Sequence, residues 1–123
     1  MTYKGSCHCQ RVLFEVNTNI IGEATQCNCS ICARKGILHF RVSASDFNLV
    51  SGEESLTVYK FGQNIANHYF CKFCGIHPFT NPKAAPSLYT VNLRCIEGID
   101  ISTLLIHHFD GIHWDDNVSL LHR

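Results

Sequence analysis

Three short clusters hold seven of the eight cysteines, and no other feature constrains the fold of this 123-residue chain as strongly. The N-terminal residues, MTYKGSCHCQ, lack the apolar stretch of a signal peptide, and no apolar run approaches the ~20 residues that span a bilayer. We therefore expect a cytoplasmic protein without a membrane partner. Disulfides are rare in that compartment, where clustered cysteines more often bind metal or take part in catalysis. The clusters are Cys7-His8-Cys9, Cys27-Asn28-Cys29-Ser30-Ile31-Cys32 and Cys71-Lys72-Phe73-Cys74, and Cys95 stands alone.

The spacing divides the seven sulfurs into a set of four and a set of three. Side chains two residues apart on an extended segment point the same way, with Cα atoms about 6.6 Å apart, and can lean together to place two sulfurs on one zinc ion. Cys7 and Cys9 have this spacing, whereas Cys71 and Cys74 are followed by a glycine that permits the tight turn of a zinc knuckle. One metal can collect all three sulfurs of the middle cluster. We therefore predict two zinc ions, held by Cys7, Cys9, Cys71 and Cys74 and by Cys27, Cys29 and Cys32.

The middle cluster offers one ligand fewer than a closed tetrahedral site. Closed zinc sites are structural, whereas catalytic ones keep a position for water or substrate. We therefore expect the site of three cysteines to bind a ligand. The alternative is a second closed site, completed by Cys95, His68 or His77. We expect Cys95 to be a buried core thiol and Trp114 a core residue. The histidines expected to pack or to lie at the surface are His8, His39, His107, His108, His113 and His122.

The pattern of apolar residues predicts a mainly β domain over residues 1–123, with the cysteines at strand ends and in loops. Residues 11–16 alternate, and residues 37–42, 56–61, 65–70 and 88–93 are rich in β-branched and aromatic side chains. Turn residues occur at 51–54 and 61–64. One short helix is expected over residues 100–105, with Asp100 or Ser102 as its N-cap.

Charge makes nucleic acid an unexpected partner. Ten basic and ten acidic residues give a formal net charge of zero, and charged residues make up only 16% of the chain. A nucleic-acid-binding domain would present a basic face or stripe. Thiolate ligands would make the metal-loaded protein acidic despite this formal charge of zero.

Five motifs occur in the order of a known family. They are GSCHCQRVLFEV, QCNCSIC, GEESLTVYKFG, HYFCKFCG and VNLRC, spread over about residues 3–99. Together they resemble the glutathione-dependent formaldehyde-activating enzyme family, which also includes centromere protein V. The resemblance implies a small β-tent of short antiparallel strands carrying zinc, similar in architecture to methionine sulfoxide reductase B. It also implies a structural zinc at Cys7, Cys9, Cys71 and Cys74 and a catalytic zinc at Cys27, Cys29 and Cys32.

The family resemblance also implies a reaction. Its members are carbon–sulfur lyases, and the named activity joins formaldehyde and glutathione into S-(hydroxymethyl)glutathione. Expected partners are therefore a small thiol such as glutathione and a small aldehyde. Arg34 and Lys35 follow the middle cluster directly and are candidate partners for the substrate's carboxylates, although a solvated loop is an equal alternative. The alternative function is a non-catalytic zinc module that binds a protein or a ligand.

Overall fold

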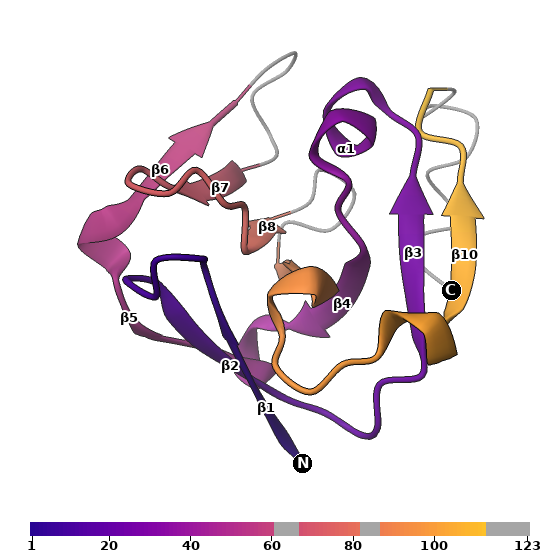
Figure 1. Cartoon of the computed structure of the whole chain (residues 1–123), viewed down its shortest axis with the longest axis horizontal. Helices are drawn as coiled ribbons and strands as arrows, with labels where there is room; N and C mark the ends of the chain where they lie inside the picture. Colours follow the sequence, from indigo (N-terminus) through magenta and orange to yellow (C-terminus); the bar gives the residue numbers. More distant parts are fainter. Residues whose placement is uncertain (61–66, 82–86, 113–123) are drawn as a thin grey trace.

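Two β-sheets dominate the computed structural model, which describes residues 1–60, 67–81 and 87–112 (Figure 1). The fold is mainly β, as predicted. The smaller sheet has three strands in the order β1-β2-β5, and the larger has seven in the order β10-β3-β4-β9-β8-β7-β6. The strands of the smaller sheet are β1 (Thr2–Ser6), β2 (Leu13–Asn17) and β5 (Phe47–Ser51). The strands of the larger sheet are β3 (Glu23–Cys27), β4 (His39–Ser43), β6 (Leu56–Tyr59), β7 (Asn67–Cys71), β8 (Phe79–Asn81), β9 (Leu88–Asn92) and β10 (Leu105–Phe109).

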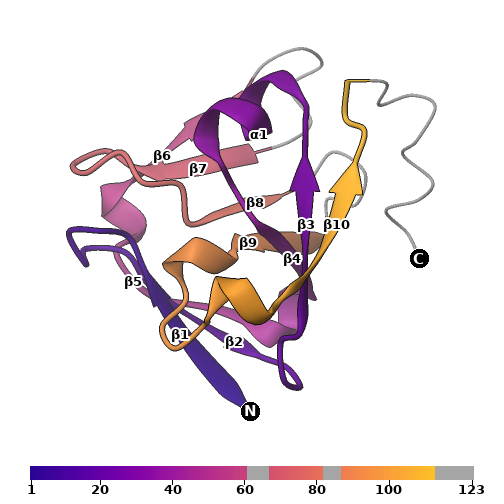
Figure 2. The ribbon, with the colours of Figure 1, turned by 45° about the vertical axis from the view of Figure 1, so that its right-hand side comes forward.

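One strand pair departs from the antiparallel arrangement that we expected. Strand β10 runs parallel to β3, with Leu105 opposite Glu23 and Phe109 opposite Cys27. The other strand pairs of the two sheets are antiparallel. The long connection from β9 returns the chain to the starting end of β3, so that β10 can add to that edge in the same direction. Both ribbon views show β3 and β10 side by side (Figures 1 and 2).

The core lies where the two sheets face each other. Strand β2 alternates, so that Phe14 and Val16 are buried while Leu13 and Asn17 are exposed. The ring of Phe47 stacks on that of Phe14 at 5.8 Å between centroids. It also meets the ring of Phe79, from the larger sheet, at 4.8 Å. These apolar contacts join the two sheets.

The helical elements are short and differ from the predicted one. A single α-helix among the described residues, α1 (Ser30–Lys35), follows β3. The expected helix at 100–105 is a 3₁₀-helix, Ile101–Thr103, capped by the side chain of Asp100, and Leu105 already belongs to β10. Pairing with β3 takes the chain out of the helix at that point. The other 3₁₀-helices are Ala44–Asp46, Glu53–Ser55 and Leu93–Cys95.

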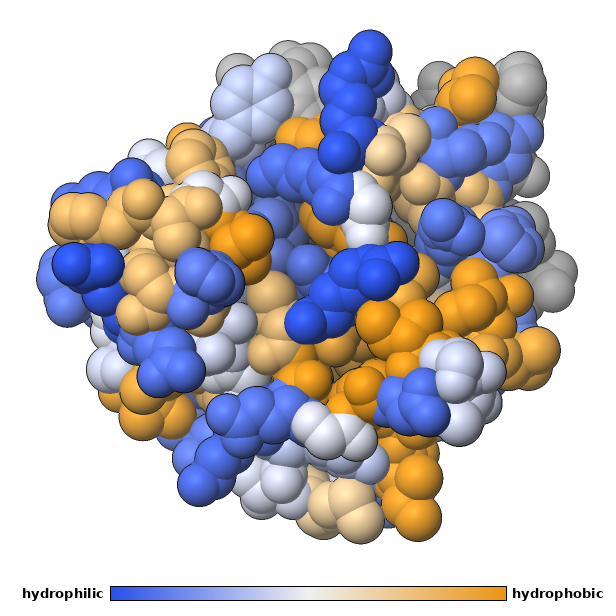
Figure 3. Space-filling model, viewed as in Figure 1, coloured by the Kyte–Doolittle hydropathy of each residue, from blue (hydrophilic) through white to orange (hydrophobic). Residues whose placement is uncertain are grey.

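Some sequence predictions fall outside the described residues. The turn at 61–64, the first part of the strand at 65–70, His113, Trp114 and His122 belong to this group. No helix in the described part of the chain is long and apolar enough to cross a membrane. In the view of Figure 1, hydrophilic side chains are spread over the molecular surface, and hydrophobic ones gather near the start of β10 (Figure 3). Leu105, at that start, is 61% exposed.

Candidate metal centres

Four cysteines from both sheets come together at one end of the interface between the sheets. Cys7 and Cys9 lie in the turn between β1 and β2, whereas Cys71 ends β7 and Cys74 lies in the turn after it. Their sulfur atoms all lie within 4.8 Å of one another, and Cys9 Sγ is 3.6 Å from the sulfurs of both Cys7 and Cys71. Two thiolates on a tetrahedral zinc ion are about 3.8 Å apart. The four residues therefore fit zinc in both donor type and spacing.

Each of the two turns directs backbone N–H groups at its sulfur atoms. The amide of Val12 lies 3.4 Å from Cys7 Sγ, and that of Cys74 lies 3.5 Å from Cys71 Sγ. Gly75 has a φ of +77°, which is the left-handed conformation expected after the second cysteine of a knuckle. Its amide donates to the carbonyl of Cys71 at 2.8 Å and closes the turn.

The charge of this cluster is divided unevenly between its thiols. Burial raises the pKa of Cys7 to about 11. Hydrogen bonds from the backbone and side chain of Arg11 lower the pKa of Cys9 to about 6. Complete deprotonation of the buried cluster therefore needs a compensating cation, which a soft divalent metal can supply.

The three cysteines of the middle cluster also converge. Cys27 ends β3, Cys29 is the N-cap of α1, and Cys32 lies in the first turn of that helix. Their sulfur atoms all lie within 4.8 Å of one another. The amide of Cys32 lies 3.5 Å from Cys29 Sγ, and the amide of Cys29 lies 3.5 Å from Cys27 Sγ. The sequence analysis missed this helix because a six-residue segment is too short to show helical periodicity.

Negative charge in this trio concentrates on the central cysteine. Hydrogen bonds from the thiols of Cys27 and Cys32 lower the pKa of Cys29 to about 2. The hydrogen bond to Cys29 raises the pKa of Cys27, and those to Cys27 and Cys29 raise the pKa of Cys32. Without metal the arrangement is therefore one thiolate held by two thiols, and a divalent cation is needed before all three can ionise. These residues also fit zinc.

The chain after β10 packs directly against this trio. A Cβ atom added at the buried Gly111 would lie 2.9 Å from the Cβ of Cys29 and closer still to the sulfur of Cys27, so only glycine fits. Asn28 holds the segment in place, because its amide nitrogen donates to Asp110 Oδ1 at 3.2 Å and its Oδ1 accepts from the Ile112 amide at 3.0 Å. The sequence offered no local signal for this contact, which joins residues more than 80 positions apart.

His39, which we expected only to pack or to lie at the surface, contacts the three-cysteine cluster. It begins β4, opposite Thr25 of β3, and its Nε2 lies 3.2 Å from Cys32 Sγ. Burial lowers the pKa of His39 to about 4, so the imidazole is neutral near pH 7. A neutral imidazole that carries its proton on Nε2 would donate a hydrogen bond to the sulfur.

None of the residues considered as a fourth ligand joins the trio. No ligand atom of Cys95, His68 or His77 lies within 4.8 Å of all three sulfurs. Burial raises the pKa of Cys95 to about 12, and its sulfur lies 3.8 Å from the carbonyl oxygen of His77. Within the described residues, the cluster therefore consists of three cysteines.

The two cationic residues after the trio have different surroundings. Both residues are exposed, but Arg34 donates from Nη1 to the carbonyl of Ser30, on its own helix, at 2.9 Å. The Nζ of Lys35 instead lies 3.1 Å from Nδ1 of His77, which is 5% exposed. Lys35 also lines a cavity of about 300 Å³, whereas Arg34 does not. The cavity is lined by Lys35, Gly75, Ile76, His77, Asn92, Arg94 and Cys95.

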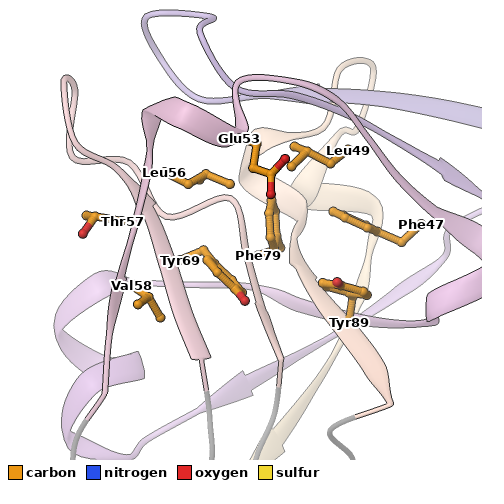
Figure 4. Close-up of a pocket in the computed structure, with 9 residues that line it drawn as sticks. All are labelled: Phe47, Leu49, Glu53, Leu56, Thr57, Val58, Tyr69, Phe79 and Tyr89. Carbon is orange, nitrogen blue, oxygen red and sulfur yellow. The ribbon is translucent and has the colours of Figure 1, made fainter.

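A larger cavity, of about 410 Å³, lies away from the cysteines. Figure 4 shows the rings of Phe47, Tyr69, Phe79 and Tyr89 around it, with the carboxylate of Glu53 directed into the same space. No cysteine or histidine lines this cavity. It therefore adds no metal ligand or thiol to either cluster.

Comparisons with known proteins place the chain in a family. Residues 2–106 match the family model described as glutathione-dependent formaldehyde-activating enzyme. The chain is also similar to a Rhodobacter sphaeroides protein of known crystal structure, with 38% sequence identity and a TM-score of 0.78. That alignment covers 85% of this chain and 97% of the other. With most of its length matched, including all seven clustered cysteines, the chain belongs to the glutathione-dependent formaldehyde-activating enzyme family.

Proposed function

We propose that this protein is a zinc-dependent carbon–sulfur lyase that acts on the adduct of a thiol such as glutathione and a small aldehyde such as formaldehyde. The main observation behind the proposal is that seven cysteines form one cluster of four and one cluster of three. One cluster has the four ligands of a closed site, whereas the other has three and no fourth ligand among the described residues. Family membership supports glutathione and formaldehyde as the substrate class.

The two clusters would have different tasks. Cys7, Cys9, Cys71 and Cys74 would hold a structural zinc between the two sheets, which supports a single domain over residues 1–123. Cys27, Cys29 and Cys32 would hold the second zinc. Bound there, zinc would supply a position at which a substrate thiol loses its proton near neutral pH. A free thiol with a pKa near 8.5 is only about 3% ionised at pH 7.

The reaction is an addition without any change of oxidation state. The substrate sulfur forms a bond to the carbonyl carbon, the C=O π bond breaks, and the thiol proton ends on the oxygen as the hydroxyl of a hydroxymethyl group. The lyase direction reverses each of these changes. His39 Nε2 can donate a hydrogen bond to Cys32 Sγ, and Lys35, three residues after Cys32 on α1, carries a proton on Nζ.

Recognition must come from the thiol. Formaldehyde has two non-hydrogen atoms, and even the best small ligands gain only about 1.5 kcal/mol per atom, or about 3 kcal/mol here. That free energy corresponds to a dissociation constant in the millimolar range. We therefore expect the thiol to supply most of the binding free energy and the aldehyde to react with the bound thiol.

Two-dimensional exchange NMR of a mixture of glutathione and formaldehyde tests this proposal. The cross-peaks between free glutathione and S-(hydroxymethyl)glutathione report the rate of interconversion at equilibrium. We expect zinc-loaded protein to accelerate the exchange and Cys29→Ser to abolish the acceleration, whereas Cys95→Ala retains it. If protein with two zinc ions bound leaves the exchange rate unchanged, the activity proposed here is wrong, and a non-catalytic zinc module becomes the better interpretation.

A further inference from the structure

Three segments far apart in the sequence build the cavity beside Lys35. Its walls come from the end of α1, from the turn that follows Cys74 and from the last residue of β9 with the residues after it. Asn92 ties two of these walls together, because its Nδ2 donates to the carbonyl of His77 at 3.0 Å and its Oδ1 accepts from the Arg94 amide at 3.1 Å. The cavity is therefore a constructed feature of the fold and not a gap between independent loops.

Lys35 is fixed at this cavity by neutral groups. A charged ammonium can only donate, so His77 Nδ1 accepts from Lys35 and His77 Nε2–H donates to Thr80 Oγ1, at 2.6 Å. His77 and Thr80 are each only 5% exposed. Burial, with a further contribution from Lys35, lowers the pKa of His77 to about 2, in keeping with a neutral imidazole. The ammonium group of Lys35 is thus held in place by a hydrogen bond to a neutral side chain.

Arg94 brings a second cation to the same cavity, anchored in a similar way. Its Nε donates to the carbonyl of Gly36 at 2.9 Å, which leaves the two Nη groups to make other contacts. The lining contains no aspartate or glutamate, and neither Lys35 nor Arg94 forms a salt bridge with any acid in residues 1–60, 67–81 and 87–112. Two positive charges that no carboxylate of the described residues pairs with form a suitable site for an anion.

The cavity also lies next to the cluster of three cysteines. Cys32 and Lys35 are three residues apart on α1, so their side chains share one face of the helix. Burial lowers the pKa of Lys35, and the neighbouring Cys32 partly offsets that effect. A molecule whose sulfur reaches the trio can therefore extend past Lys35 into the cavity.

We infer that this cavity binds a carboxylate of the thiol substrate through Lys35 and Arg94. The inference rests on the proposed function and extends it to specificity: the protein selects thiols that carry a carboxylate over neutral thiols. Lys35 and Arg94 supply the charge, whereas His77 and Thr80 are positioning residues that fix Lys35. Arg34, although adjacent in sequence, has no part in this site because it does not line the cavity.

Calorimetric titration tests the inference by binding and not by activity. Zinc-loaded protein is titrated with glutathione, with its diethyl ester, which keeps the thiol but lacks both carboxylates, and with S-methylglutathione, which keeps the carboxylates but lacks the thiol. We expect Lys35→Gln and Arg94→Gln each to weaken glutathione binding about tenfold or more, as for a lost charge-assisted hydrogen bond, and to leave binding of the ester unchanged. Arg34→Gln is the matched control and should bind all three ligands as the wild type does.

The three ligands separate failure of the inference from failure of the proposed function. If glutathione binds more tightly than S-methylglutathione but the Lys35 and Arg94 variants bind both normally, the carboxylate site is overturned and the sulfur contact stands. If glutathione and S-methylglutathione bind equally and binding of both depends on Lys35 and Arg94, the carboxylate site is supported and the sulfur contact is wrong. Equal loss in Arg34→Gln, or equal affinity of wild type for glutathione and its ester, overturns the inference.

A measurement on the wild type keeps the test independent of variant folding. In ¹⁵N-resolved NMR spectra, glutathione should shift the Nε–H signal of Arg94 and the amide signals of Gly75 and Ile76. The ester should shift them much less. If glutathione binds and these three signals stay unchanged, the cavity is not the carboxylate site.

Discussion

Replacing Gly111 with alanine should damage the three-cysteine cluster selectively. The added methyl group would lie 2.9 Å from Cys29 Cβ and closer still to Cys27 Sγ, and both distances are far inside normal van der Waals contact. Because Cys27 ends β3 and Cys29 caps α1, neither can shift without moving an ordered element. The easier movement displaces the segment after β10, which Asn28 holds by two hydrogen bonds.

The loss of stability can be calculated for both outcomes, overpacking against the cysteines or displacement of the segment after β10, and the two values agree. Overpacking that forces backbone shifts costs about 1–3 kcal/mol, and two lost hydrogen bonds at about 0.5–1.5 kcal/mol each fall in the same range. For 123 residues the unfolding entropy is about 0.26 kcal/mol/K, so Tm should fall by about 4–12 °C. Displacement of Cys27 should also weaken its metal site, so that a chelator removes one zinc equivalent at a lower concentration than it does from the wild type.

Thermal unfolding followed by circular dichroism, with zinc release followed by a colorimetric chelator, measures both effects. Gly22→Ala is the matched control, because a Cβ at Gly22 meets no atom within 4 Å and its backbone is not left-handed. We expect this control to keep the Tm and the zinc content of the wild type. If Gly111→Ala behaves like Gly22→Ala in both assays, the close packing of the C-terminal segment against Cys27 is wrong.

Further predictions concern the two metal sites and the histidines. Cys71→Ser should give unfolded or insoluble protein, because a structural zinc contributes on the order of 10 kcal/mol to the free energy of folding. Cys29→Ser should fold. Similar circular dichroism spectra of the two variants would contradict the division into a structural site and an open one. Cys95→Ala should keep both zinc equivalents by atomic absorption, and loss of one would make Cys95 a ligand. His39→Phe should fold but hold the second zinc more weakly in chelator competition, since Cys32 loses a hydrogen-bond partner; unchanged competition would exclude that role. In the folded protein the pKa of His77 is about 2, below its ordinary value of 6.5, so the unfolded state binds the proton more readily. The free energy of unfolding should therefore fall by up to about 1.4 kcal/mol per pH unit as the pH drops below 6.5. Urea unfolding at pH 7 and pH 5.5 should show a smaller loss for His77→Gln than for wild type, and equal losses would refute this assignment.

The sequence alone was sufficient to predict the class of fold and the grouping of the sulfurs. The spacing that would let Cys7 and Cys9, or Cys71 and Cys74, chelate one metal ion is local, so it can be recognised from a few consecutive residues. Strand β2 was recognisable for the same reason, because burial of one face imposes a period of two along the chain. The turn at Gly75 followed from its need for a positive φ, which is a property of one residue.

What surrounds the cysteines was decided only by tertiary structure. Gly111 meets Cys27, His39 meets Cys32, and Arg94 reaches Gly36 because strand pairing brings distant segments together, and no local pattern records such partners. The parallel pairing of β10 with β3 has the same origin and overrode the expected helix. Lys35 and Arg34 are equivalent in the sequence, and only the position of His77 across the cavity distinguishes them. The sequence thus specified the cysteine pairs and the trio through local spacing, whereas long-range packing brought the two pairs together and specified the environment in which a substrate would bind.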